Sequence, residues 1–160
     1  MAKKQDKSSQ KRPPRITNRK ARHDYHITEV LECGLKLTGT EVKSLRAGNA
    51  SIDDAFVRII GGELYLVGAD IAHYPQAVAA MQHAPARDRK LLVHRRQIGK
   101  IESHIRQKGK TAVATALYFT RGIAKCEIGI AVGKRQYDKR ESLKRRQQQR
   151  DIDREISRRR

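Results

Sequence analysis

Residues 25–37 read YHITEVLECGLKL, and this stretch does most to decide the fold because nearly every second side chain in it is apolar. Six of its seven odd-numbered positions are apolar, whereas most even-numbered positions are polar. Successive side chains of a strand point to opposite faces, so this period of two predicts a long strand with one buried face. Gly34 falls inside the pattern, and we expect a bulge or bend there.

Two glycine-centred turns, Gly61-Gly62 and Arg121-Gly122, each lie between apolar segments and predict two β-hairpins. The four flanking segments are AFVRII (55–60), ELYLVGA (63–69), TAVATALYFT (111–120) and IAKCEIGIAV (123–132). Hairpins of alternating strands favour an antiparallel sheet over a parallel one.

Two helices complete the order of elements. GTEVKSLRAGN, residues 39–49, predicts a short helix that Thr40 caps and Gly48 stops. A stripe of apolar residues with helical spacing between Leu91 and Ile105 predicts a longer helix, with Asp88 as its cap. A helix between the third and fourth strands is typical of the OB-fold, so we predict a mainly β, antiparallel OB-fold-like barrel with two to three helices.

The charge of the chain is unevenly distributed. Residues 1–22 carry nine Lys/Arg and one acid, residues 134–160 carry twelve and five, and the segment between them carries fifteen and eleven. Residues 1–22 have the low hydrophobicity of a disordered arm, so we expect order to begin near His23. The formal net charge of +19 predicts a polyanionic partner, and nucleic acid is the leading candidate.

Several classes of protein are disfavoured. No segment approaches the roughly 18 apolar residues of a membrane span, and no apolar region follows the N-terminal lysines as in a secretory signal. Cys33 and Cys126 form no CxxC pair, which fits a reducing cytoplasm. The histidines show no metal-ligand spacing, Asp53-Asp54 reads as a turn, and no nucleotide-binding or hydrolase motif occurs. We therefore expect no metal, no cofactor and no enzymatic activity.

The aromatic and basic residues indicate the kind of nucleic acid. With two Phe, five Tyr and no Trp the chain offers few stacking surfaces, which favours a structured RNA over an unstacked strand. Lys43 and Arg46 share one face of the short helix. The expected start of the long helix carries Arg87, Arg89, Lys90, Arg95 and Arg96. A solvated surface can have the same composition, so each residue alone leaves both readings open.

Residues 134–160 contain good helix formers and no Gly or Pro, but too few apolar residues for a core. We expect this tail to be frayed in isolation and to order in an anion-lined groove, with permanent disorder as the alternative.

Five stretches, in this order, resemble the family of SsrA-binding proteins (small protein B). They are NRKARHDY (18–25), GTEVKSLRAGN (39–49), HAPARDRKLLVHR (83–95), KGKTAVATALYF (108–119) and GKRQYDKR (133–140). The resemblance implies a six-stranded OB-like barrel over residues 18–133, between a disordered basic arm, 1–17, and a tail, 134–160, that is disordered when free and helical on the ribosome. It also implies a cytoplasmic, monomeric adaptor that binds the tRNA-like part of tmRNA and takes part in rescuing stalled ribosomes, without a chemical step of its own.

The resemblance also assigns residues. Those matching the family's tmRNA-binding positions are Asn18, Lys20, Arg22, Glu32, Lys43, Arg46, Lys90, Leu91 and Leu92. Those expected near the decoding centre of the ribosome are Gly133, Lys134, Arg135, Tyr137, Asp138, Lys139 and Arg140. Residues beyond these would form a helix in the empty mRNA channel. Two rivals stay open: a ribosomal or ribosome-assembly protein that binds rRNA structurally, and a nuclease or RNA-modifying enzyme.

Overall fold

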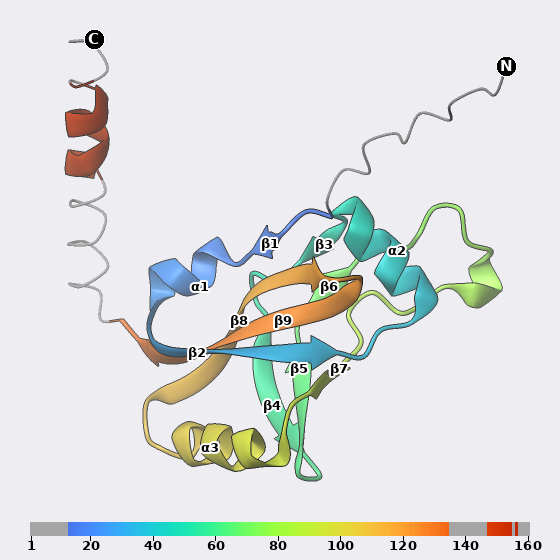
Figure 1. The fold of residues 1–160 in the computed structure, drawn as a ribbon, viewed down its shortest axis with the longest axis horizontal. Helices are drawn as coiled ribbons and strands as arrows, with labels where there is room; N and C mark the ends of the chain where they lie inside the picture. The colour runs from blue at the N-terminus through green and yellow to red at the C-terminus, as the bar shows by residue number, and fades with distance from the viewer. Residues whose placement is uncertain (1–12, 135–146, 155, 157–160) are drawn as a thin grey trace, which may run out of the picture.

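The computed structural model describes residues 13–134, 147–154 and 156 (Figure 1). Six antiparallel strands close into a ring in the order β8-β4-β5-β7-β2-β9, and β9 pairs back onto β8. The strands of the ring are β2 (Tyr25–Leu35), β4 (Phe56–Ile60), β5 (Glu63–Val67), β7 (Arg89–Leu92), β8 (Lys110–Thr120) and β9 (Ile123–Gly133). The predicted mainly β, OB-fold-like barrel of six strands is therefore confirmed.

The remaining helices and short strands lie outside this ring. They are β1 (Ile16–Thr17), α1 (Arg19–Asp24), α2 (Gly39–Ala47), β3 (Ala50–Ser51), β6 (Asp70–Ile71), the 3-10 turn η1 (Ala79–Met81) and α3 (Arg95–Ile105). Residues 147–154 are also helical. Because β1 pairs with β8 and α1 follows it, the expectation that order begins near His23 is wrong.

The long strand β2 has the period-two burial that its sequence predicts, but its irregularity lies elsewhere. The register with β9 shifts between Ile27 and Glu29, not at Gly34. Gly34 pairs with Leu92 of β7 on one side and with Lys125 of β9 on the other. A Cβ atom at Gly34 would lie 3.1 Å from the Cβ of Leu92, so glycine here permits the close approach of β7 rather than a bulge.

Both predicted helices form, with different starts. Thr38 rather than Thr40 caps α2, and its backbone N–H donates to the carboxylate of Glu41 at 2.7 Å. The helix α3 begins at Arg95, where the ring of His94 accepts from the N–H of Arg96 at 3.4 Å.

The expected start of the long helix near Asp88 is wrong, because residues 89–92 form β7 instead. Their side chains alternate between core and surface, with Arg89 and Leu91 buried. In the sequence, an alternation of only four residues cannot be distinguished from the first turn of an amphipathic helix.

The core fills the barrel and extends to the helices at its two ends. Leu64, Leu66 and Ile128 are fully buried inside the ring. Leu45 of α2 and Ile101 of α3 join the same cluster from opposite ends of the barrel (Figure 1). The two predicted hairpin turns are confirmed at residues 61–62 and 121–122, and all four residues have positive φ, as a type I′ turn requires.

We expect Gly68→Ala to destabilise the protein more than Gly62→Ala. Both glycines have a positive φ, so alanine at either site costs about 1–2 kcal/mol. At Gly68 the added Cβ would also lie 2.8 Å from the carbonyl oxygen of Asp54, whereas nothing lies within 4 Å at Gly62. The extra cost is about 1–3 kcal/mol. Urea denaturation of the two variants measures it, and equal midpoints would contradict the clash.

Candidate nucleic-acid interface

The helix α1 is fixed to the barrel by Asn18, which is 1% exposed. Its side-chain oxygen accepts from the N–H of Ala21 at 2.7 Å. Its side-chain nitrogen donates to the carbonyls of Ile52 (2.5 Å) and Ala114 (3.0 Å). The predicted direct contact between Asn18 and RNA disagrees with this burial, since the amide is already engaged on both sides. Asn18 instead positions α1.

The two cations predicted on α1 are exposed. Lys20 pairs with Asp54 at 2.5 Å, and this hydrogen bond and the charge of Asp54 raise the pKa of Lys20. Arg22 presents its guanidinium to solvent, while its backbone carbonyl accepts from Nζ of Lys134 at 3.0 Å. The N–H of Lys134 also donates to the carbonyl of Asp24 at 2.9 Å. The first residue of the tail is therefore attached at two points to the end of α1.

The other predicted tail residues divide between two parts of the chain. Gly133 ends β9 opposite Tyr25. Arg135, Tyr137, Asp138, Lys139 and Arg140 lie outside the residues that the structure describes. Farther along, the helical residues 147–154 are exposed and held by pairs such as Gln147–Asp151 (3.1 Å). The expectation of a frayed free tail stays a prediction.

On α2, Lys43 and Arg46 share one exposed face, as their spacing predicts. Nζ of Lys43 lies 5.2 Å from the centre of the Tyr74 ring. The guanidinium carbon of Arg46 lies 5.3 Å from the centre of the Phe119 ring. The ring faces attract these cations and hold them near the surface.

The three predicted residues of β7 do not share a face. Lys90 is half-buried and its ammonium group binds the carboxylate of Glu63. Leu91 is 2% exposed and packs in the core, whereas Leu92 is 51% exposed. Direct RNA contact by Leu91 therefore disagrees with its position, and Lys90 and Leu92 are the two that a macromolecule can reach.

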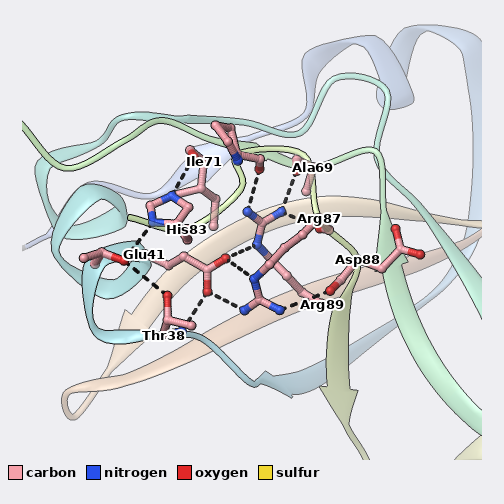
Figure 2. Close-up of polar contacts among 10 residues, drawn as sticks. Thr38, Glu41, Ala69, Ile71, His83, Arg87, Asp88 and Arg89 are labelled. Carbon is pink, nitrogen blue, oxygen red and sulfur yellow. Dashed lines mark hydrogen bonds and ion pairs between the residues drawn. The ribbon is translucent and has the colours of Figure 1, made fainter. Parts of the chain in front are cut away.

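A buried ionic network joins α2 to β7 and to the loop before it (Figure 2). The carboxylate of Glu41, which is fully buried, accepts from Nε of Arg87 at 2.8 Å and from a terminal nitrogen of Arg87 at 2.6 Å. It also accepts from Nε of Arg89 at 2.9 Å. The carboxylate thus binds two guanidinium groups in addition to Thr38.

The prediction that Arg89 belongs to a basic surface at the start of the long helix is wrong. Arg89 is fully buried, and its remaining N–H groups donate to the carbonyls of Ala69 (2.6 Å), Arg87 (2.9 Å) and Pro85 (2.6 Å). A buried arginine is tolerated when its charge is paired and its donors are bonded, and both conditions are met here. Its bonds therefore join the residue before β6 to the end of the loop that leads into β7.

His83 extends the network to the same loop (Figure 2). Its Nε2 donates to the carbonyl of Ile71 at 2.9 Å, and its Nδ1 lies 2.8 Å from the hydroxyl of Thr40. The loop 72–88 has no regular structure apart from η1, so these side-chain bonds replace the backbone bonds of a sheet or helix.

The network shifts the pKa values of its members. Burial raises the pKa of Glu41, but hydrogen bonds from Arg87 and Thr38 and the charge of Arg89 outweigh it and bring the pKa to about 2. Burial lowers the pKa of Arg89 against the opposing charge of Glu41. An arginine nevertheless keeps its proton at all ordinary pH values, so both groups are charged.

The predicted residue Glu32 lies in a second cluster, on the outer surface of β2, β8 and β9. We define the outer cluster as Arg15, Glu32, Tyr118, Lys125 and Glu127. Glu32 accepts from the hydroxyl of Tyr118 and from Nζ of Lys125 (3.0 Å), and these two hydrogen bonds lower its pKa. Arg15 pairs with Glu127 at 2.5 Å. Sequence reasoning missed Arg15, Tyr118, Lys125 and Glu127 because no local motif links them.

The described residues contain no group of three or more His, Cys, Asp or Glu side chains that could hold a metal ion. Within the same part of the chain, no helix is long and apolar enough to cross a membrane. The candidate interface is thus a set of exposed cations on α1 and α2 with the half-buried Lys90 of β7, together with the outer cluster.

Comparison with known proteins identifies the family. The family described as SmpB protein matches residues 15–158. The SsrA-binding protein of Thermobifida fusca (strain YX) is 48% identical over 100% of both chains. That of Leifsonia xyli subsp. xyli is 51% identical over 88% of this chain and 89% of its own. A solved structure described as "tmRNA-SmpB: a journey to the center of the bacterial ribosome" has a TM-score of 0.66 and 44% identity, and covers 81% of this chain and 94% of its own.

We expect Glu41→Gln to destabilise the protein by about 3–5 kcal/mol, because it leaves Arg89 buried without a counter-charge. Glu63→Gln is the matched control, since it makes the same change in the half-exposed pair with Lys90 and should cost at most about 1 kcal/mol. Chemical denaturation at neutral pH measures both. Equal losses would show that the buried pair has no special role.

The same pair predicts a pH dependence. The pKa of Glu41 in the folded protein, about 2, lies below its ordinary value of 4.5. Ionised Glu41 therefore stabilises the fold above about pH 4.5, and this contribution is lost as the pH falls towards 2. The difference in stability between the wild type and Glu41→Gln should shrink over that range.

Proposed function

This chain belongs to the SmpB protein family, and we propose that it is an RNA-binding adaptor that binds the tRNA-like part of tmRNA and delivers it to stalled ribosomes. The observation that carries the proposal is the likeness over the whole chain to SsrA-binding proteins. The adaptor binds and positions RNA and performs no reaction of its own. Its partners are tmRNA and the ribosome, which place it in the cytoplasm.

The exposed cations on the barrel suit a folded RNA. Lys20 and Arg22 lie on α1, Lys43 and Arg46 on α2, and Lys90 on β7. Each is attached to a rigid element, so together they match phosphates at fixed positions. A double-stranded or tightly folded RNA presents phosphates in this way, and it is recognised mainly by its shape. Leu92 adds an exposed apolar contact beside Lys90.

Two predicted residues take an indirect role. Asn18 caps the N-terminus of α1 and so orients Lys20 and Arg22. Leu91 anchors β7 in the core and so orients Lys90 and Leu92. Glu32 is the exposed acid of the set; its carboxylate can accept from a base amino group or a 2′-hydroxyl but repels phosphates. We assign it to selection rather than attraction.

The tail has a separate role in the proposal. Gly133, Lys134, Arg135, Tyr137, Asp138, Lys139 and Arg140 would lie near the decoding centre of a ribosome whose message has ended. The helical residues 147–154 expose their side chains, and Ile152 is 50% exposed, so this segment is suited to a charged groove and not to the core. We propose that it extends into the vacant mRNA channel, where rRNA phosphates neutralise its cations.

A chain that ends at Lys134 tests this division. It keeps the barrel and the contacts of Lys134 with α1, so it should bind the tRNA-like domain of tmRNA nearly as well as the full chain. Tagging of a stalled nascent chain in a cell-free translation system should be lost. Loss of RNA binding as well would contradict the division. Binding of the full chain to free ribosomal subunits but not to tmRNA would instead favour a structural rRNA-binding protein.

Arg46→Ala tests the basic face of α2. If Arg46 contacts one phosphate, its removal should weaken binding and lower the slope of log K against log salt by about one unit. Arg106→Ala is the control, since Arg106 is an exposed cation at the C-cap of α3 and its removal changes the net charge equally. Filter binding over a series of KCl concentrations measures both slopes. The same slope in both variants would remove Arg46 from the interface.

A further inference from the structure

The outer cluster contains a stacked pair that the proposed function does not yet use. The guanidinium carbon of Arg15 lies 4.5 Å from the centre of the Tyr118 ring. The guanidinium group thus lies over the ring, and the Arg15 side chain remains 46% exposed. A planar cation covered on one side by an aromatic ring presents its other side as a flat surface. Unstacked bases of RNA bind such surfaces by stacking.

Both members of the pair are held in place by carboxylates. A terminal nitrogen of Arg15 donates to Glu127 at 2.5 Å, and the hydroxyl of Tyr118 donates to Glu32. Glu127 is itself fixed by the hydroxyl of Thr115 at 2.8 Å. The flat surface is therefore formed before any ligand arrives, which lowers the entropy that binding must overcome.

The charges of the cluster favour an uncharged ligand group over a phosphate. Glu32 and Glu127 lie directly opposite each other on β2 and β9, an arrangement that destabilises a sheet unless cations neutralise it. Arg15 and Lys125 do so, which makes the four charges of the cluster sum to zero. A neutral cluster gains little from counterion release, so it suits an uncharged part of the RNA, a base or a ribose.

We propose that Arg15 and Tyr118 form a stacking platform for one unstacked base of the bound RNA, and that the adjacent Glu32 accepts a hydrogen bond from its amino group or from a 2′-hydroxyl. The proposal rests on the function proposed above and adds two residues to it. Tyr118 lies on the outer face of β8, whereas the next residue, Phe119, packs against the core and is covered by Arg46. In the proposal the cations of the barrel hold the RNA backbone, and the platform reads one base.

Arg15→Lys separates stacking from charge. Lysine keeps the positive charge and can still pair with Glu127, but it lacks the planar group. We expect binding to the tRNA-like domain of tmRNA to weaken roughly five- to tenfold, in the range of one lost base stack, with an unchanged salt slope. Arg58→Lys is the matched control, because Arg58 is an exposed arginine 5.5 Å from the Phe56 ring and lies outside the outer cluster. It should bind like the wild type.

A second measurement locates the base. Chemical probing of 2′-hydroxyl reactivity, nucleotide by nucleotide, should find one position that the wild type and Arg58→Lys change and Arg15→Lys does not. Tyr118→Phe keeps the ring but removes one of the two hydrogen bonds to Glu32, and it should alter the reactivity of the same nucleotide. Thermal melting followed by circular dichroism checks that all variants are folded.

The outcomes separate the two proposals. If the wild type does not bind the tRNA-like domain, the proposed function fails. If the wild type binds and Arg15→Lys binds equally well, or if Arg58→Lys loses as much affinity, the platform is overturned while the proposed function stands.

Discussion

The structure depends on one buried carboxylate, that of Glu41. It binds Arg87 and Arg89 from inside the protein, and neither Glu41 nor Arg89 is exposed to water. Each charge would be costly to bury alone, so each needs the other in place. Such a network contributes less net stability than its many bonds suggest, because desolvation offsets them. Its effect is to allow one arrangement of α2, β7 and the loop 72–88, where an apolar contact would tolerate several.

That arrangement decides which side chains reach the surface. One face of α2 turns Glu41 and Leu45 inward, and the opposite face turns Lys43 and Arg46 outward. In β7 the alternation that buries Arg89 exposes Leu92 and half-exposes Lys90. The inner ionic network and the outer basic face are therefore two sides of the same elements, and a change in one moves the other. Glu41 and Arg89 are buried and cannot contact RNA, but they fix the elements that carry the proposed RNA-binding surface.

Sequence reasoning found the parts of the fold that depend on local pattern. The alternation in residues 25–37 and the turns at 61–62 and 121–122 follow from strand geometry and predict an antiparallel sheet. The position of the helix between the third and fourth strands then predicts the barrel. It failed where partners are distant in the chain. Arg89 reads as one more surface cation, because its partner Glu41 is 48 residues away. The outer cluster joins Glu32 to Tyr118 over 86 residues and Arg15 to Glu127 over 112, which no local motif reveals.

The barrel and residues 134–160 differ in how far their cations are paired. Most cations of the candidate interface on the barrel already have a partner: Lys20 has Asp54, Lys90 has Glu63, and Lys43 and Arg46 have aromatic rings. An RNA must replace these partners with better-placed groups, so its affinity for the barrel depends more on the positions of those groups than on total charge. Residues 134–160 carry twelve Lys/Arg against five acids, an excess that attracts any polyanion. In the proposed function, selective binding therefore belongs to the barrel and long-range attraction to the tail, and Lys134, bound to the end of α1, connects them.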